Sequence, residues 1–339
     1  MDPESVDSVS RVPHGSDDSV DLDLSANCNP FVPEGARAAY DRAFDASRTY
    51  PRDDYPAFRR AAADHVGCDP EHVVPTPGGL AAIRLAVGVT VAPGDSVLVP
   101  YPSFGEYARE VRLQGGVPEF VPHADLLDTN PDGRALAVLC APNNPTGDLP
   151  DPDRLDAFLD RCRAAGTPLL ADEAFLDFTD RPSLAGASGV IVARSLTKVF
   201  GLPGLRAGFA VADGRLGERL RTAVPAWALG TPAARVGARC MREEAFVRET
   251  CRRVARERER LREGLARHFE VYPSDAPFLL CDVGADPAPL LAALRERGIA
   301  LRDATTFRGL DSHVRVAVRT AEATDRLLDA LAEVDGVLD

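Results

Sequence analysis

The chain has 339 residues, of which 45% are hydrophobic, so it is long enough for two domains that share one core. Its formal net charge of −13 argues against binding to nucleic acid and to anionic membranes. The sequence has no run of eighteen apolar residues, which excludes a transmembrane helix, and its seven cysteines lack the CxxC pairs of a zinc site.

Residue usage indicates the environment in which the chain works. The first residues are acidic and polar, unlike a secretory signal, and an odd number of scattered cysteines fits reduced thiols, so we expect a cytoplasmic protein. An acid-rich, lysine-poor composition suggests a halophilic protein, because dispersed carboxylates keep a surface hydrated in high salt. A GC-rich genome, which replaces lysine codons with arginine codons, is the alternative explanation.

Strand and helix patterns alternate through the first two thirds of the chain. We predict a short strand within residues 22–30, helices over 34–46, 56–66 and 81–89, and buried strands near 97–102, 137–140, 168–171, 190–193 and 209–211. Such alternation predicts an α/β fold with a doubly wound, mostly parallel sheet. The glycines of Thr76–Leu80 open a helix, where backbone N–H groups make a cradle for an anion.

The last third has a different pattern. Residues 231–268 alternate arginine and glutamate with apolar positions, which predicts one long helix or two with a solvated face. Strands near 278–283, 299–302 and 314–318 and helices near 287–297 and 321–334 indicate a smaller α+β domain. We therefore predict three parts: an N-terminal segment (1–34) that packs with the small domain, a large domain (35–228) and the small domain (229–339).

Lys198 is the only lysine in the chain. Arginine stays protonated in proteins, whereas a desolvated lysine can lose its proton and attack a carbonyl. A chain that keeps one lysine therefore points to chemistry that arginine cannot do. The alternative is a surface lysine retained by chance.

Polar side chains follow three of the predicted strands where each one ends. Asn144 follows the strand at 137–140, Asp172 ends the next, and Ser195 and Lys198 follow the strand at 190–193. Ligands of α/β sheets bind at this edge. A carboxylate there can pair with a pyridinium nitrogen. The hydroxyl of Ser195 and the guanidinium of Arg206, later in the chain, can together bind a phosphate.

The motifs PNNPTG, DEAF and SLTK, in that order and with an arginine eight residues after the lysine, resemble the fold-type I pyridoxal-phosphate enzymes of the class I/II aminotransferase group. The resemblance implies that Lys198 bonds to the cofactor aldehyde, that Asp172 holds the ring nitrogen and that Asn144 contacts the ring hydroxyl. It implies that pyridoxal 5'-phosphate is bound by Gly78, Gly79, Leu80, Phe104, Asn144, Asp172, Phe175, Ser195, Thr197, Lys198 and Arg206.

Two aromatic residues extend this resemblance. Phe104 occupies the position at which the family stacks a ring on the pyridine, although plain core packing is the alternative. Tyr50 resembles the tyrosine that family members contribute across a dimer interface to the neighbour's cofactor phosphate. The resemblance therefore implies a homodimer with shared active sites. A non-catalytic module that kept the fold is the alternative from another class, and the complete set of motifs argues against it.

Within the family, five segments resemble the branch that decarboxylates O-phosphothreonine more than the histidinol-phosphate aminotransferases. They are residues 23–30, 172–178, 194–198, 309–312 and 315–319. Phe175 stands where most aminotransferases of this group carry a tyrosine, and an apolar filler without effect is its alternative explanation. We expect a carboxy-lyase that makes 1-aminopropan-2-yl phosphate for cobalamin synthesis. The alternative is an aminotransferase acting on histidinol phosphate or a similar substrate.

The substrate phosphate needs a cationic pocket of its own. The resemblance implies His14 and Arg302 for that pocket, with Ser25 and Asn27 lining it. A surface histidine and a structural ion pair are the respective alternatives for the first two. Arg319 matches the arginine with which the family holds the substrate carboxylate, and Arg315 is the alternative; because alternate residues of a strand share a face, both are expected to face the site.

Overall fold

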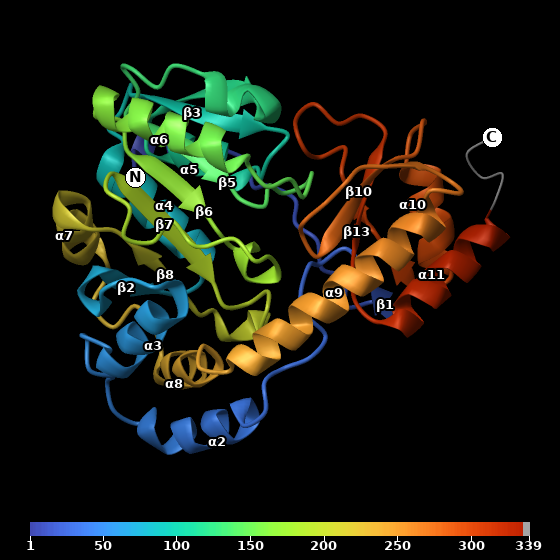
Figure 1. The fold of residues 1–339 in the computed structure, drawn as a ribbon, viewed down its shortest axis with the longest axis horizontal. Coiled ribbons are helices and arrows are strands. Elements are labelled where there is room, and N and C mark those ends of the chain that lie inside the picture. Colours follow the sequence, from blue (N-terminus) through green and yellow to red (C-terminus); the bar gives the residue numbers. More distant parts are fainter. Residues whose placement is uncertain (335–339) are drawn as a thin grey trace.

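The structure is a computed structural model, and it describes residues 1–334. A seven-stranded sheet in the order β2-β8-β7-β6-β5-β3-β4 forms the larger part of the molecule (Figure 1). The strand β8 runs in the opposite direction to the other six. The strands are β2 (Val73–Thr76), β3 (Ser96–Tyr101), β4 (Val117–Pro122), β5 (Leu136–Cys140), β6 (Leu169–Asp172), β7 (Val190–Ser195) and β8 (Gly208–Val211).

The central strands are apolar at almost every position because helices cover both faces of the sheet. Along β7, Val190 and Val192 belong to one hydrophobic cluster and Ile191 and Ala193 to another, as the two-residue period of a strand requires. The surrounding helices are α2 (Ala36–Ala46), α3 (Pro56–Val66), α4 (Gly79–Thr90), α5 (Glu106–Leu113), α6 (Pro152–Ala165), α7 (Gly214–Ala223) and α8 (Thr231–Cys240).

A smaller part contains a four-stranded antiparallel sheet in the order β12-β13-β10-β9. Its strands are β9 (Glu270–Val271), β10 (Phe278–Asp282), β12 (Arg302–Asp303) and β13 (His313–Ala317), and its helices are α10 (Ala288–Glu296) and α11 (Ala321–Glu333). The N-terminal strand β1 (Leu22–Asp23) pairs in parallel with β11 (Ile299–Ala300), so this stretch joins the small part. The short helix α1 (Pro3–Val6) packs instead against α5 of the large part, so the prediction that residues 1–34 pack with the small domain holds only for the later residues.

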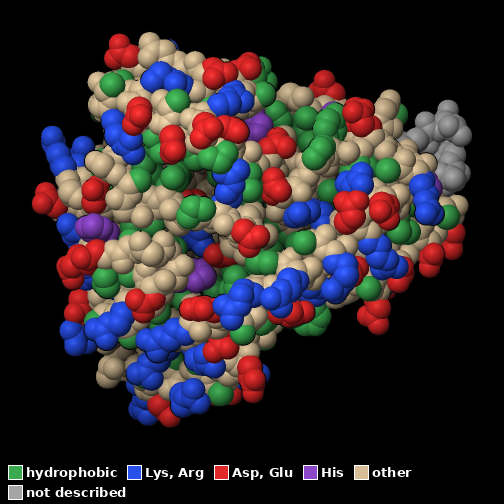
Figure 2. Space-filling model, in the orientation of Figure 1, with side chains coloured by type: hydrophobic (Ala, Val, Ile, Leu, Met, Phe, Trp, Pro, Cys, Tyr) green, Lys and Arg blue, Asp and Glu red, His purple; other side chains and the backbone are tan. Residues whose placement is uncertain are grey.

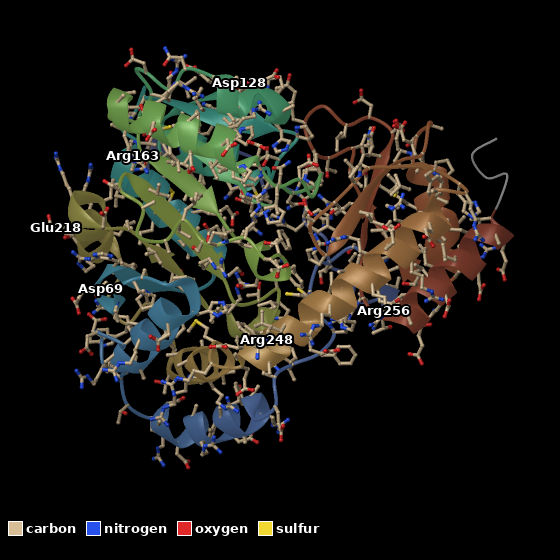
Figure 3. The ribbon with its side chains drawn as sticks, viewed as in Figure 1. Asp69, Asp128, Arg163, Glu218, Arg248 and Arg256 are labelled. Atoms are coloured by element: carbon tan, nitrogen blue, oxygen red, sulfur yellow. The ribbon has the colours of Figure 1, made fainter. Side chains whose placement is uncertain are left out.

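The long helix α9 (Glu244–Leu265) runs from the large part to the small one (Figure 1). Basic and acidic side chains are interspersed along its exposed face (Figure 2). Arg248 and Arg256 project from that face (Figure 3), and Arg248 pairs with Glu244 one turn earlier at 3.2 Å. The charges of α9 therefore form the solvated face that the sequence predicted.

The α/β fold with a doubly wound, mostly parallel sheet and a smaller α+β part is confirmed. Residues 231–268 form two helices, α8 and α9, which was one of the two predicted arrangements. The domain boundaries stay a prediction. Because α8 packs against α2 and α3, we propose that the small part begins within α9 and not at residue 229. None of the helices in the described residues is long and apolar enough to span a membrane.

Candidate active site

The carboxyl ends of β5, β6 and β7 meet at one edge of the large sheet. Asp172 is paired in register with Cys140 on one side and with Ala193 on the other, which aligns the polar residues that follow these strands. A cavity of about 200 Å³ opens there, between the two parts of the molecule. It is lined by Asn144, Phe175 and Lys198 from the large part and by Arg302 and Arg315 from the small part.

A tight cradle lies at the N-terminus of α4. A Cβ atom added to Gly78 would lie 2.7 Å from the Nη2 atom of Arg206, and one added to Gly79 would lie 3.1 Å from the Cβ of Ser195. Gly78 also has a φ of +94°, a conformation that favours glycine. The hydroxyls of Ser195 and Thr197 are 2.8 Å apart, so this loop, a guanidinium and two hydroxyls converge.

The first turn of α4 adds backbone donors to this cradle. N–H groups in the first turn of a helix, such as those of Gly79 and Leu80, have no acceptor inside the helix, and the helix dipole favours an anion beside them. Arg206 has a left-handed backbone with a φ of +53°, which a non-glycine residue rarely adopts. The donor set therefore fits a phosphate group.

Asp172 lies at the end of β6 and is buried. The hydroxyl of Tyr107 donates to its Oδ2 at 2.6 Å, and the N–H of Ala174 donates to its Oδ1 at 3.1 Å. Burial raises the pKa of Asp172, while these two donors and Lys198 lower it. A cationic ring nitrogen beside this carboxylate would supply the positive charge that favours the ionised form.

Lys198 follows β7 and projects into the cavity, with its Nζ 5.7 Å from the centre of the Phe175 ring. Burial lowers the pKa of its amine, because the charged ammonium loses its hydration. Arg315 and Arg206 lower the pKa of Lys198 further, whereas Cys28 and Asp172 raise it. The net direction is therefore a lowered pKa, and the neutral amine is the nucleophilic form of lysine.

The two asparagines of the PNNPTG loop have different partners. Asn143 accepts from the Ser103 hydroxyl at 2.8 Å and donates to the Pro102 carbonyl at 3.0 Å, so it fixes the loop. Asn144 lines the cavity, and its side-chain oxygen accepts a hydrogen bond from Arg315. Asn144, and not its neighbour, therefore faces the cavity.

Arg302 and Arg315 bring two positive charges to one side of the cavity. Arg302 donates to the carbonyl of Pro13 at 2.8 Å and to the hydroxyl of Thr306 at 2.7 Å, and Arg315 donates to the carbonyl of Ser25 at 2.9 Å. Neither guanidinium forms an ion pair with a carboxylate within residues 1–334. Burial, and secondarily the charge of Arg302, lowers the pKa of Arg315 to about 9, so an anion would stabilise this pair.

Two buried polar atoms in this cavity have no hydrogen-bond partner in the described part of the chain: Oδ1 of Asn27 and Nε of Arg315. Buried polar groups are normally paired, so these two atoms indicate where a ligand would bind. Ser25 lines the cavity as well, although its hydroxyl is held by Asp23 at 2.6 Å.

Residues 8–16, which we call the strap, pass over the cavity from the large part toward β1. The ring of His14 lies 5.7 Å from that of Phe104, and its Nε2 is 3.0 Å from the buried carboxylate of Glu106. His14 is 48% exposed at its side chain, so it sits at the mouth of the cavity with an acid behind it. Its ring therefore borders the cavity, held from behind by its contact with Glu106.

Arg319 and Tyr50 do not line this cavity. The guanidinium of Arg319 donates to the carbonyl of Asp23 at 2.8 Å, so the prediction that both arginines face the site is wrong. The physical reason is that β13 ends at Ala317, after which the alternation of a strand no longer applies. Tyr50 stacks on Trp227 at 4.5 Å and is 78% exposed, so it could serve only a site outside its own chain.

Sequence reasoning missed two polar residues of the site, Tyr107 and Glu106. A signal for Tyr107 existed, because it lies three residues after Phe104 at the start of a helix and such residues share a face. The pairing of Glu106 with His14 joins residues far apart in the sequence, and no local pattern indicates it.

The geometry fits pyridoxal 5'-phosphate. The cradle of Gly78, Gly79, Ser195 and Arg206 would hold its phosphate, Asp172 its ring nitrogen and Asn144 its ring hydroxyl, with Lys198 as the amine beside its aldehyde. All the residues predicted to bind the cofactor within one chain lie around this edge of the sheet. Their individual roles remain proposals.

Known proteins are similar to this chain over nearly its whole length. The histidinol-phosphate aminotransferase 1 of Archaeoglobus fulgidus is 30% identical, with 92% of this chain and 99% of the relative covered. The threonine-phosphate decarboxylase of Salmonella typhimurium is 33% identical, with 92% and 91% covered. A solved structure of histidinol-phosphate aminotransferase from Sinorhizobium meliloti in complex with pyridoxal-5'-phosphate has a TM-score of 0.83 at 21% identity, covering 93% and 91%, which shows the fold alone.

These relatives confirm the predicted family. They support the alternative prediction, an aminotransferase, more than the decarboxylase. Several relatives are histidinol-phosphate aminotransferases, whereas the decarboxylase is represented by fewer. The prediction of pyridoxal 5'-phosphate as the cofactor is confirmed at the level of the family. The family described as Aminotransferase class I and II matches residues 18–331, and this protein belongs to that pyridoxal-phosphate-dependent family.

Proposed function

We propose that the protein is an enzyme that acts on a small amino compound carrying a phosphate. The observation that carries this proposal is the pair of buried arginines, Arg302 and Arg315, which face the same cavity as Lys198 and lack carboxylate partners in residues 1–334. Charge-assisted bonds from a guanidinium to phosphate or carboxylate are among the strongest in proteins. A substrate with anionic groups would satisfy both.

When bound, pyridoxal 5'-phosphate supplies an electron sink for the bond that breaks at the substrate's α-carbon. Asp172 would hold the ring nitrogen of the cofactor, and the amine of Lys198, which reaches the cavity, would take up or give a proton at the substrate's α-carbon. Arg302, Arg315 and the strap orient the substrate, and that orientation selects which bond breaks.

Transamination of histidinol phosphate is the reaction that the relatives favour. In that reaction Arg302 and Arg315 would first hold the phosphate of the amino donor. After the donor leaves, they would hold the carboxylates of the amino acceptor. We therefore propose this aminotransferase activity first.

Decarboxylation of O-phospho-L-threonine, to (R)-1-aminopropan-2-yl phosphate, is the second candidate. Phe175 favours it, because no hydroxyl at that position can bond the cofactor ring oxygen, and the ring packs edge-on against Phe278 at 5.1 Å. The identity of 33% to a threonine-phosphate decarboxylase is consistent with it. This substrate carries both a phosphate and a carboxylate, one for each arginine.

One assay separates the two reactions. The purified protein, loaded with the cofactor and kept in high salt, is given either histidinol phosphate with 2-oxoglutarate or O-phospho-L-threonine alone. Glutamate formation in the first mixture supports the aminotransferase, and CO₂ release in the second supports the decarboxylase.

The variant Arg302→Gln tests the substrate pocket. We expect KM for the phosphorylated substrate to rise roughly 10-fold or more, because a charge-assisted bond is lost, with cofactor affinity unchanged. Arg219→Gln, which changes an exposed arginine on α7, is the matched control. Turnover of neither substrate, or an unchanged KM in the Arg302 variant, would contradict the proposal.

We also propose a homodimer in which Tyr50 reaches the partner's cofactor phosphate. Exposed aromatic residues on and around α2, Tyr40, Phe44 and Tyr50 with Trp227, support it, because large apolar side chains gathered on a surface mark an interface. Sedimentation of the purified protein measures its oligomeric state, and a monomer at micromolar concentration would contradict this proposal.

A further inference from the structure

A second cavity lies on the other side of the strap from the catalytic one. Its volume is about 420 Å³, within the range of about 300–1,000 Å³ that small-molecule sites occupy. Its walls come from three places: the strap, the α5 and β3–β4 region of the large part, and the loop 306–308 of the small part. We refer to it as the strap cavity.

Four arginines line the strap cavity: Arg11, Arg109, Arg112 and Arg308. Arg109 is neutralised, because it pairs with Glu106 and Glu110 at 3.2 Å each, and it also donates to the carbonyl of Ser10. The other three form no ion pair with an acid within the part of the chain that the structure describes. In a protein with a net charge of −13, three uncompensated cations around one hollow form a local positive site.

One aromatic ring, that of Phe120, lies near two of these guanidinium groups. The Arg308 guanidinium carbon lies 3.9 Å from the centre of the Phe120 ring, and that of Arg112 lies 5.7 Å from the same centre. A guanidinium that stacks on a ring uses its face for that contact, so its in-plane N–H groups stay free to donate. Arg308 and Arg112 thus lie near this ring, and neither pairs with an acid in residues 1–334.

We propose that the strap cavity binds a phosphorylated small organic molecule, at a site distinct from the catalytic cavity. Phosphate matches the fork of arginine donors, and the side chains of Tyr101, Phe104 and Phe307 offer an apolar wall for the body of the ligand. This inference does not depend on which reaction the enzyme performs, so its failure would leave the proposed function standing.

The two cavities share walls but not cations. Phe104, Thr306 and Phe307 border both, whereas Arg302 and Arg315 line the catalytic cavity and Arg112 and Arg308 line the strap cavity. Removing the latter two charges should therefore affect the second site without removing the donors of the first.

Calorimetric titration of the cofactor-loaded enzyme with adenosine 5'-monophosphate tests the proposal. Saturation with pyridoxal 5'-phosphate keeps the probe out of the phosphate cradle. We expect saturable binding that weakens at least about 5-fold in Arg112→Gln and in Arg308→Gln and is unchanged in Arg219→Gln. Inorganic phosphate should compete with the probe, and adenosine, which lacks the phosphate, should not bind.

Several results would overturn the proposal. One is no binding at millimolar probe in low salt, where screening is weakest. Another is equal binding of the probe in Arg112→Gln, Arg308→Gln and Arg219→Gln. A third is loss of probe binding in Arg302→Gln, which would mean that the probe occupies the catalytic cavity. The same titration is repeated with O-phospho-L-threonine and with histidinol phosphate. If either binds in the strap cavity, the ligand is a second substrate molecule; if neither does, the ligand is another phosphate ester.

Discussion

Replacing Tyr107 with phenylalanine tests how a hydrogen bond stabilises the charged form of Asp172 in the active site. The tyrosine hydroxyl donates to Asp172 at 2.6 Å, and both residues are buried, so no water can replace the lost donor. A hydrogen bond to a charged group contributes about 1.5–3 kcal/mol, or roughly a 10- to 100-fold change in an equilibrium constant. The variant keeps the ring and its edge-on contact with Phe104, at 5.5 Å, so packing changes little.

The direction of the effect follows from the charge. Burial already raises the pKa of Asp172, and loss of a donor that lowers it raises the pKa further. We therefore expect weaker binding of the cofactor, by roughly 10- to 100-fold, and a rise of roughly one to two pH units in the pH below which the cofactor dissociates.

Absorbance titration with pyridoxal 5'-phosphate, repeated across pH, measures both effects. Tyr55→Phe is the matched control, because the Tyr55 hydroxyl donates to the carbonyl of Leu229 at 2.8 Å, away from the cavity, and its loss lowers stability but not cofactor affinity. Equal affinity and an equal pH dependence in wild type and Tyr107→Phe would refute the role given to this hydrogen bond.

Three further outcomes follow from the geometry. Gly78→Ala should weaken cofactor binding at least about 10-fold in the same titration, because a Cβ would lie 2.7 Å from Arg206 at a φ of +94°; unchanged affinity would contradict the cradle. Asp177 is paired with Arg194 and, at 2.9 Å, with His65, and these partners hold the pKa of Asp177 well below its usual range. The ionised Asp177 therefore stabilises the fold above a pH of about 4, and this stabilisation is lost as the pH falls. Acid unfolding followed by circular dichroism should therefore be less steep in Asp177→Asn, and an identical acid limb would refute this. If Tyr50 acts across a dimer, mixed dimers of Tyr50→Ala and Lys198→Ala chains should recover one working site, and activity equal to that of the separate variants would argue against it.

Much of the catalytic edge was predictable because it depends on local patterns. Buried strands followed by polar residues indicate the carboxyl edge of a parallel sheet, and Lys198 is unique in the chain, so Asn144, Asp172 and Ser195 could be placed beside it. The two glycines at 78 and 79 likewise predicted a cradle that the structure shows.

The substrate side was less predictable because contacts between distant segments form it. Strand alternation predicted that Arg315 and Arg319 share a face, but β13 ends before residue 319, and sequence periodicity does not give the end of a strand to within two residues. The strap crosses from α5 to β1, and the position of His14 over Phe104 follows from that path and not from residues beside it.

The central claim is that one amine carries the chemistry, and a single labelling measurement tests it. The protein is mixed with pyridoxal 5'-phosphate, reduced with borohydride, digested and analysed by mass spectrometry. Because Lys198 is the only lysine, the N-terminus is the only other primary amine. We predict a stoichiometric phosphopyridoxyl group on Lys198. A protein that stays unlabelled, or is labelled only at its N-terminus, would contradict this account.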